Sequence, residues 1–426
     1  MVASGMAVTT TPAGAAFPGI NGKIACATNR LGPPGPNPPF EIFTFEPTGT
    51  EVNPTNISNS LGTNEGRPRW RSDGRKIAFE SNRAGGNNIF IADADGSNVQ
   101  QVTFTNDATG PAWHPDGSQI VYQRNIPGLF FEVYKINVDG TGATPLASHP
   151  AEDSLPFWSP DGTLIAFGSR RVDPGADIHL MDSFGNNVSP PLGVPGVEDS
   201  WPNWSPDGSQ LAFHSRRDDP TGEEIYRMPA TGGAATRLTF NNVPQTTPAT
   251  PTVFDIFPAY SPDGTRIVWN SGRGATNFGE VYHMSSTVGD SDIVRITNNA
   301  AVDQRCDWQP LCTIYSVPGA ITAGTPGNDI ICGTEGDDRI AGAGGNDIVY
   351  GFGGSDQLSG GDGVDRLFGG IGNDSIVGGA GADFVSGGPG DDRFSADGTD
   401  RIDIGAGTAN LCAINGAAAA CPPRLS

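Results

Sequence analysis

A nine-residue repeat near the C-terminal end of the chain constrains the fold more than any other feature. It runs from Gly324 to Ser395 and occurs eight times in a row without an insertion. The copies read GTPGNDIIC, GTEGDDRIA, GAGGNDIVY, GFGGSDQLS, GGDGVDRLF, GGIGNDSIV, GGAGADFVS and GGPGDDRFS. The eighth position of every copy is apolar, and the sixth is always an aspartate: Asp329, Asp338, Asp347, Asp356, Asp365, Asp374, Asp383 and Asp392.

Each position of the repeat has a physical role. Glycines permit a tight turn, because a positive φ costs glycine little. The aspartate supplies a hard carboxylate oxygen, which is the ligand type that calcium prefers. The three residues around the apolar position form a short strand whose central side chain points into a thin core between two sheets. The repeat therefore predicts stacked turns with carboxylates along them.

The pattern resembles the repeats-in-toxin (RTX, haemolysin-type) family, whose G-G-x-G-x-D-x-U-x units stack into a calcium-bound parallel β-roll. The resemblance implies that the eight aspartates are calcium ligands. Because the ligands of one ion come from turns n and n+2, it also implies up to about six Ca²⁺ ions as the cofactor. The alternative is a flexible linker rich in glycine and aspartate, although a linker has no reason to keep three positions in phase.

The charge of this segment explains why it would need a cation. Residues 324–404 hold 15 Asp and Glu against 4 Arg, which is half of the net charge of −22 of the whole chain. Carboxylates on stacked turns lie roughly 5 Å apart and repel by about 3 kcal/mol per pair at an effective dielectric constant near 20. One apolar side chain per turn contributes only about 1.5 to 3 kcal/mol. We therefore expect the segment to be disordered without calcium and to fold on binding it.

Composition bounds the rest of the chain. A length of 426 residues accommodates two domains, and 60 Gly with 36 Pro indicates many turns. No run of 18 apolar residues occurs, so no membrane span is expected. The acidic net charge argues against a nucleic-acid partner. Residues 1–16 carry no charged side chain and are expected to be a signal-peptide remnant or a disordered leader.

A longer repeat precedes the nonapeptides. Its copies share an aromatic residue followed by a turn, as in WSPDG, and their aromatic positions are Trp70, Trp113, Trp158, Trp204 and Tyr260. These positions are 43, 45, 46 and 56 residues apart, about the length of four strands with their turns. The Pro-Asp-Gly turn is followed by an apolar strand, a polar turn and an alternating strand. The blocks resemble the WSPDG repeats of TolB-like β-propellers over about 290 residues.

The two ends of this region predict how the ring closes. Residues 21–26 match a repeat that lacks its first strand, and residues 306–310 match that strand alone. The expected fold is therefore all-β, with a six-bladed β-propeller closed by N- and C-terminal strands of one blade, followed by a parallel β-roll. The expected domains are the propeller at 17–311, the roll at 312–404 and a C-terminal cap at 405–426.

Six cysteines suggest three disulfides, for which 15 connectivities are possible. Cys26 and Cys306 fall on the two strands expected to pair in the composite blade. Cys312 and Cys332 bracket the start of the roll, and Cys412 with Cys421 would close its cap. Free buried cysteines are the alternative.

An acidic residue and an arginine recur at matching positions of five blades. The acids stand five residues before the aromatic position, and the arginines follow the second strand: Glu65, Asp153, Asp199, Asp255 and Asp303 with Arg83, Arg171, Arg217, Arg273 and Arg30. The Trp113 blade has Ala108 and Ile126 instead. Because both members are lost together, we interpret them as an ion pair within each blade. A ligand-binding acidic ring and a catalytic site are the alternatives.

No catalytic motif or catalytic residue is identified. The five histidines share no blade position and no metal-ligand spacing, and His114, which replaces the serine of its turn, is expected to be solvated. Two insertions, 31–39 and 241–257, are expected to be surface features.

The sequence favours a secreted or cell-surface calcium-binding protein without enzymatic activity, whose propeller binds an unidentified protein or glycan. The alternative is an extracellular hydrolase or lyase acting on polysaccharide or ester substrates. A third hypothesis is a TolB-like partner of envelope proteins.

Overall fold

The computed structural model describes residues 19–31, 38–49, 54–60, 62–128, 130–146, 149–172, 174–194, 196–218, 222–240, 254–273, 279–289, 292–414, 416–419 and 421. The expected leader, most of the two insertions and part of the expected cap lie outside these residues. The described residues form strands and turns, and they include no helix long and apolar enough to cross a bilayer.

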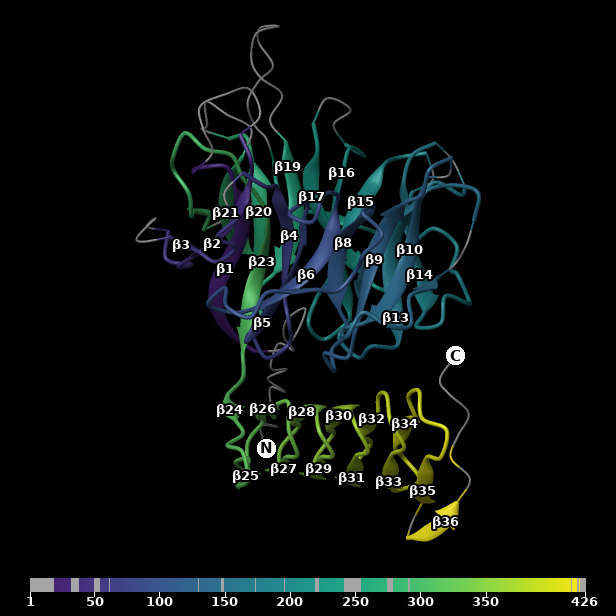
Figure 1. The fold of residues 1–426 in the computed structure, drawn as a ribbon. Coiled ribbons are helices and arrows are strands. Elements are labelled where there is room, and N and C mark those ends of the chain that lie inside the picture. The colour runs from purple at the N-terminus through teal and green to yellow at the C-terminus, as the bar shows by residue number, and fades with distance from the viewer. Residues whose placement is uncertain are drawn as a thin grey trace, which may run out of the picture.

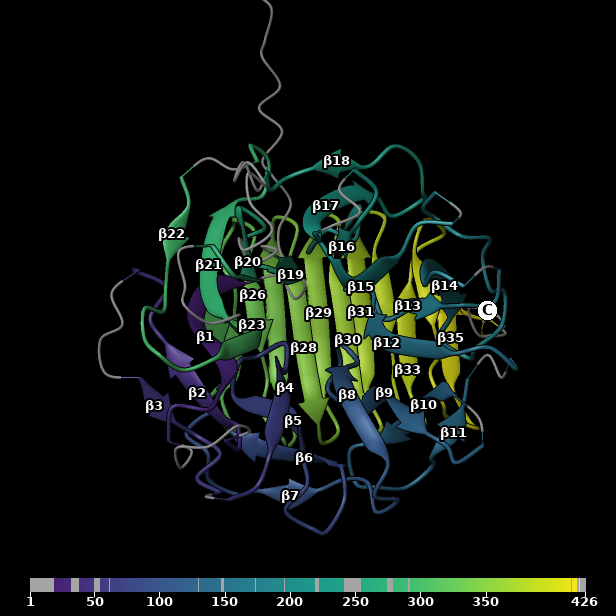
Figure 2. The same cartoon turned by 90° about the horizontal axis from the view of Figure 1, so that it is seen from above.

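Residues 19–311 form a six-bladed β-propeller, as predicted, with each blade's first strand nearest the central axis of the ring, here called the channel (Figure 2). The first three blades, from the channel outward, are β23 (Asp303–Leu311), β1 (Ile20–Thr28), β2 (Glu41–Phe45) and β3 (Thr55–Asn56); β4 (Glu65–Trp70), β5 (Lys76–Ser81), β6 (Asn88–Asp93) and β7 (Gln100–Gln101); and β8 (Ala108–Trp113), β9 (Gln119–Asn125), β10 (Phe131–Asn137) and β11 (Thr144–Pro145).

The other three blades are β12 (Asp153–Trp158), β13 (Leu164–Ser169) and β14 (Asp177–Asp182); β15 (Asp199–Trp204), β16 (Gln210–Ser215), β17 (Glu224–Pro229) and β18 (Thr236–Arg237); and β19 (Asp255–Tyr260), β20 (Arg266–Ser271), β21 (Glu280–Ser285) and β22 (Val294–Arg295). Within each blade the neighbouring strands pair antiparallel. The ring closes where β1 pairs with β23, as the two end motifs predicted. Each blade's inner strand pairs with one strand only, so the ring closes by joining its two chain ends in one blade rather than by pairing one blade with the next.

The WSPDG motif holds each blade's first turn and joins it to the preceding blade. Ser159 Oγ donates to Asp161 Oδ1 at 2.6 Å and accepts the N–H of Leu164, while Gly162 adopts φ 70°. The aromatic residue packs between blades, where the Trp204 indole N–H donates to the Phe157 carbonyl at 3.1 Å. The motif is therefore both a turn signal and an interblade contact.

Residues 314–414 form a parallel β-roll, also as predicted, in which each strand pairs with the strand one full coil later. One sheet consists of β24 (Ile314–Tyr315), β26 (Ile330–Cys332), β28 (Ile348–Gly353), β30 (Arg366–Ile371), β32 (Phe384–Ser386) and β34 (Arg401–Asp403). The other consists of β25 (Ile321–Ala323), β27 (Arg339–Gly344), β29 (Gln357–Asp362), β31 (Ser375–Ala380), β33 (Arg393–Ala396), β35 (Leu411–Ile414) and β36 (Ala417–Ala419).

The core of the roll is the row of apolar eighth positions, at most 3% exposed: Ile331, Ile340, Val349, Leu358, Leu367, Ile376, Val385 and Phe394. The two sheets contribute alternate members of this row. The sheet that begins with β24 lies toward the propeller (Figure 1), so the roll spans the ring at the end where the WSPDG turns lie.

The three disulfides join the cysteines that the sequence placed together: Cys26 with Cys306, Cys312 with Cys332, and Cys412 with Cys421. The first links β1 to β23 across a sequence separation of 280 residues. It therefore locks the seam of the ring, and the second fixes the first turns of the roll just after the last propeller strand.

Candidate metal sites

The repeat aspartates are buried along the turns of the roll, and one oxygen of each carboxylate is occupied by the backbone. Asp347 Oδ1 accepts the N–H of Asp329 at 2.8 Å, and the same bond recurs every nine residues up to Asp392 Oδ1, which accepts the N–H of Asp374 at 3.0 Å. Each bond spans 18 residues, which is two repeats. The aspartates therefore tie turn n to turn n+2.

The second oxygen of six of these carboxylates is buried without a hydrogen-bond partner among the described residues. The six are the Oδ2 atoms of Asp347, Asp356, Asp365, Asp374, Asp383 and Asp392. The first two repeats differ, because Asp329 Oδ2 accepts both the N–H and the hydroxyl of Thr325, and Asp338 Oδ2 accepts the same pair from Thr334. Leaving a buried carboxylate oxygen unpartnered is costly, so six positions lack a positive partner.

Backbone oxygens converge on the same places. At Gly342, Gly351, Gly360 and Gly369, a Cβ would meet both the Asp Oδ2 of the same repeat and the carbonyl oxygen of the glycine that opens the repeat two turns later. These glycines are obligatory because the two oxygens fill the space of a side chain. Each such turn thus pairs one carboxylate oxygen with one carbonyl oxygen from the turn two repeats on.

The electrostatics of the row oppose ionisation. Burial, with a smaller contribution from neighbouring carboxylates, raises the pKa of Asp356 to about 7 and that of Asp374 to about 8. The same causes raise the pKa of Asp383 to about 6, and burial raises that of Asp392 to about 6. A charged carboxylate here is unfavourable until a cation accompanies it.

This donor set fits a divalent calcium ion. Calcium takes six to eight hard oxygen ligands, with backbone carbonyls among them. No three acidic, histidine or cysteine side chains gather into one cluster among the described residues, so the carbonyls of the glycine turns would supply the remaining ligands.

The ladder continues past the eighth repeat, which the sequence analysis missed. Asp400 Oδ1 accepts the N–H of Asp383 at 3.1 Å, and Asn410 Oδ1 accepts that of Asp392 at 2.6 Å. Asp400 follows Asp383 by 17 residues rather than 18, so the repeat phase hides it. The 18-residue spacing from Asp392 to Asn410 was the signal in the sequence that the ladder continues.

The acid–arginine pairs of the propeller are confirmed in five blades. Their shortest N–O distances include 2.7 Å for Arg171–Asp153 and 3.0 Å for Arg83–Glu65, and the remaining pairs are Arg217–Asp199, Arg30–Asp303 and Arg273–Asp255. The blade that lacks this pair has a shifted substitute, in which Arg124 binds Asp107 through two hydrogen bonds of 2.9 and 3.0 Å. All six blades are thus tied at the same end.

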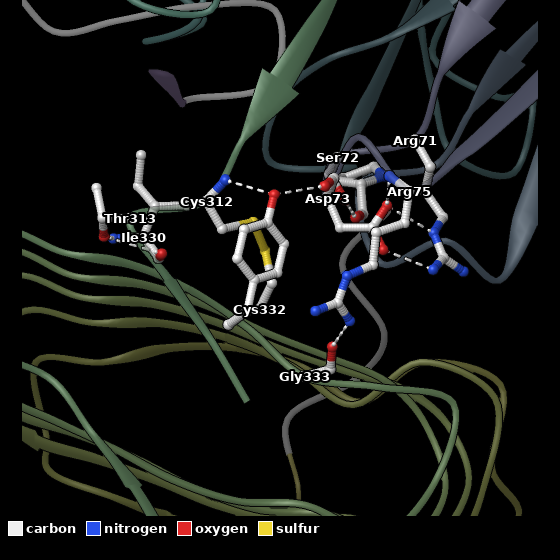
Figure 3. The surroundings of a disulfide bond; sticks show 11 residues. Arg71, Ser72, Asp73, Arg75, Cys312, Thr313, Ile330, Cys332 and Gly333 are labelled. Carbon is white, nitrogen blue, oxygen red and sulfur yellow. Dashed lines mark hydrogen bonds and ion pairs between the residues drawn. A yellow bond between two sulfur atoms is a disulfide. The ribbon is translucent and has the colours of Figure 1, made fainter. Parts of the chain in front are cut away.

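The roll contacts the propeller through side chains that the sequence analysis did not select. Arg71 pairs with Asp73 in its own turn and with Glu335 of the roll at 2.6 Å, and its guanidinium lies 4.3 Å from the centre of the Phe352 ring. Beside the Cys312–Cys332 disulfide, Arg75 donates to the Gly333 carbonyl at 3.2 Å (Figure 3). The Tyr315 hydroxyl donates to the Asp73 carbonyl at 3.0 Å. The WSPDG turn of this blade therefore also serves as a docking point.

An aromatic row covers the rest of this contact. Tyr350, Phe352 and Phe368 are at most 2% exposed, and their rings stack at 5.1 to 5.6 Å. Tyr350 and Phe368 occupy the ninth position of the third and fifth repeats, whereas Ser359 and Val377 occupy it in the fourth and sixth. Large residues in alternate repeats were the signal that one sheet of the roll is covered.

The expectation that His114 is solvated is wrong. Its side chain is only 13% exposed and its Nδ1 lies 2.7 Å from Asp116 Oδ1. This turn lines a cavity together with Ser386 and Asp403 of the roll, so the roll covers part of the turn.

Comparisons with known proteins agree with both parts of this architecture. Residues 40–187 match the TolB beta propeller domain, and residues 323–358, 359–394 and 377–408 match the RTX calcium-binding nonapeptide repeat. The chain carries a TolB-type propeller and an RTX roll. It is similar to the Tol-Pal system protein TolB of Anaeromyxobacter dehalogenans, with 32% identity over 91 residues, which are 21% of each chain.

Two further TolB proteins are similar to this chain, one in sequence and one in fold. The protein TolB homolog of Chlorobium chlorochromatii is 37% identical over 113 residues, which are 26% of this chain and 25% of that protein. This chain thus spans about a fifth to a quarter of the length of these relatives. The crystal structure of TolB from Acinetobacter baumannii superimposes with a TM-score of 0.56 at 21% identity, covering 69% of this chain and 68% of that one. This likeness shows the propeller fold alone.

Proposed function

We propose that this chain is a secreted calcium-binding protein whose RTX roll folds on Ca²⁺ and whose propeller acts as a binding scaffold. The observation that carries the proposal is the row of six buried, unpartnered Asp Oδ2 atoms, four of them beside a glycine carbonyl. Asp347, Asp356, Asp365, Asp374, Asp383 and Asp392 would be the principal ligands, with Asp329 and Asp338 at the start of the row. Up to about six ions would be bound.

The chain's own residues make folding of the roll conditional. Its aspartates must leave water to occupy the turns, and burial disfavours their charged form, as the raised pKa of Asp374 shows. Bound Ca²⁺ would supply the positive charge that lets these carboxylates stay ionised. The apolar core has one residue per repeat, which is too little to offset the repulsion by itself. Binding and folding of the roll are therefore linked.

Export suits both features. Three disulfides form and persist in oxidising compartments. Extracellular calcium modules have dissociation constants of about 10⁻⁴ to 10⁻³ M. Sites built from neutral carbonyls and one carboxylate per turn suit calcium affinities in this range. The roll would thus stay unfolded before export and fold afterwards.

Folding of the roll would also cover one end of the propeller. The ordered roll presents Phe352 and Glu335 to Arg71 and presents the Gly333 carbonyl to Arg75. We infer that calcium therefore determines whether the WSPDG end of the ring is covered. The opposite end remains for a protein or glycan ligand.

The hydrolase or lyase alternative depends on histidines and carboxylates gathered around the channel. Among the described side chains at the channel centre, arginines and aromatic rings predominate, including Arg69, Phe157 and Trp201. The carboxylates there, Glu80 and Asp307, lie beside arginines, and the nearby His214 packs against the Phe257 ring. This chemistry favours binding, so we keep the proposal to a scaffold.

Hydrogen exchange on the full chain tests the proposal. Amides of residues 324–404 should be protected in millimolar calcium and lose protection in a chelator, whereas the propeller strands stay protected in both. Magnesium at equal concentration is the control, because it prefers six-coordinate, partly hydrated sites. Equal protection of the roll with calcium and with chelator would refute the calcium-dependent fold.

A further inference from the structure

The inner strand of every blade contains a bulge at the same level of the channel. The bulge lies two residues after the first residue of the strand, which is the acid of the acid–arginine pair in five blades and Ala108 in the sixth. The backbone there has a positive φ of 47° to 63° in all six blades, at Arg67, Gly110, Leu155, Trp201, Phe257 and Arg305. The strand register shifts in the same place, as between Ser200 and Asn203. A non-glycine residue in this region bears an energetic cost, because its side chain crowds the backbone. Five of the six bulges bear this cost, so the fold keeps these side chains in one particular direction.

Contacts across the ring show that this direction is inward. Arg67 belongs to the β4 blade, and Trp201 belongs to the β15 blade on the opposite side of the ring (Figure 2). The Arg67 guanidinium nevertheless lies 5.7 Å from the Trp201 ring, and Arg69 lies 5.7 Å from the same ring. Trp201 contacts Phe257 with ring centres 4.5 Å apart, and the Arg305 guanidinium lies 5.3 Å from the Phe257 ring. Three arginines and two aromatic rings thus meet at the centre of the channel.

The charges of this group do not balance. Arg67 is paired with Glu80 at 2.6 Å. Arg69 is only 5% exposed, its Nη1 donates to the Pro68 carbonyl, and its Nε has no hydrogen-bond partner. The neighbouring Asp307 carboxylate accepts the N–H of Trp70 at 2.8 Å. Two carboxylates therefore face three guanidinium groups in the described channel, within a chain whose net charge is −22.

Arg305 is the unbalanced member. It is half-buried, its Nε has no partner, and it forms no ion pair among the described residues. Burial, then the positive charge of Arg67, lowers the pKa of Arg305 to about 10, with Glu80 opposing the shift and Arg69 adding to it. A half-buried guanidinium that must share one nearby carboxylate, Glu80, with Arg67 is only partly compensated. An anion that enters the channel would remove this penalty.

We propose that this channel group, formed by Arg67, Arg69 and Arg305 with Trp201 and Phe257, is a binding site for an organic carboxylate. A planar guanidinium fork matches a carboxylate through two parallel hydrogen bonds. A single excess positive charge matches a monoanion rather than a doubly charged phosphate. The two rings offer apolar surface for the body of the ligand. Because the roll lies across the WSPDG end of the ring (Figure 1), the ligand enters from the opposite end.

This site deepens the proposed scaffold role of the propeller without depending on calcium binding by the roll. The test uses the full chain in calcium, with benzoate and acetate as probes, inorganic phosphate as the competing anion, and tryptophan fluorescence with thermal unfolding as readouts. Benzoate should change the fluorescence saturably and raise the melting temperature. Arg305→Gln should weaken benzoate at least tenfold, while Arg216→Gln, at an arginine that is 44% exposed and paired with Glu223, should not.

Stability separates a binding role from a structural one. Without added anion, Arg305→Gln should melt at the same temperature as the wild type or higher, because it removes a buried unpaired charge. Arg305→Lys keeps the charge but loses the fork, so it should bind benzoate more weakly than the wild type while remaining folded. A lower melting temperature of both variants without anion would overturn the proposal, as would unchanged benzoate binding by Arg305→Gln. Phosphate binding as tight as benzoate would overturn the choice of a carboxylate. Calcium-dependent protection of the roll, followed in the same variants, reports separately on the proposed function.

Discussion

Arg71 of the propeller and Glu335 of the roll form an ion pair of 2.6 Å across the contact between the two parts of the molecule. The two partners differ in burial, since the Arg71 side chain is 5% exposed and that of Glu335 is 58% exposed. Arg71 also holds Asp73, which is fully buried. The pair therefore joins a structural residue of the propeller to a surface residue of the roll.

This asymmetry predicts unequal effects of substitution. Arg71→Gln leaves Asp73 buried without its cation and should lower the free energy of unfolding by about 3 to 5 kcal/mol. Glu335→Gln removes an exposed partner and should cost at most about 1 kcal/mol. Urea unfolding of the full chain in calcium measures both values. Similar losses for the two variants would mean that the interdomain pair, rather than the Arg71–Asp73 pair, dominates.

The repeat aspartates should not contribute equally to calcium binding. Asp365→Asn removes the charge from an unpartnered Oδ2 atom in the middle of the row, and should weaken calcium binding about tenfold, or about 1.4 kcal/mol. Asp329→Asn is the matched control, since its Oδ2 already accepts two hydrogen bonds from Thr325. Calorimetric titration of the full chain with calcium compares them. An equal or larger loss for Asp329→Asn would show that the Thr325 contacts do not mark the end of the row.

The acid–arginine pairs predict a difference between blades. Asp153 is fully buried beside Arg171, whereas Asp107 and Arg124 are 17% and 23% exposed. Arg171→Gln should therefore cost about 3 to 5 kcal/mol, and Arg124→Gln about 1 kcal/mol. Urea denaturation at pH 7 in calcium gives the two values. If the Arg124 variant proved the less stable, burial of the carboxylate could not be the deciding factor.

Glu132 makes the stability of the propeller depend on pH. Burial, and then the nearby Asp153, raises the pKa of Glu132 to about 7 from an ordinary value of 4.5. The folded state therefore binds more protons than the unfolded state between these values, and stability falls as pH rises through this range. Glu132→Gln should remove that loss. The melting temperatures of the variant and the wild type should be close at pH 4.5 and diverge in favour of the variant by pH 8. A constant difference across this range would contradict the raised pKa.

The sequence determined the local and periodic parts of this protein. A turn such as Ser159 to Gly162 is set by short-range hydrogen bonds and one positive φ, so its motif predicts it directly. The nonapeptide phase likewise determined the roll, because each strand meets its neighbour at a constant separation of 18 residues. The two end motifs were sufficient to predict the seam and the Cys26–Cys306 bond.

Only the tertiary structure decided which side chains meet across the ring and which meet between the propeller and the roll. Arg305 and Trp201 carry no motif, and they come together because bulges in separate blades turn their side chains into one channel. Phe352 and Arg71 lie 281 positions apart, and they stack because the roll lies against the WSPDG turns. Repeats encode contacts within and between successive copies, since those contacts recur at a constant spacing. Contacts that occur once leave no period in the sequence, so the folded chain alone shows them.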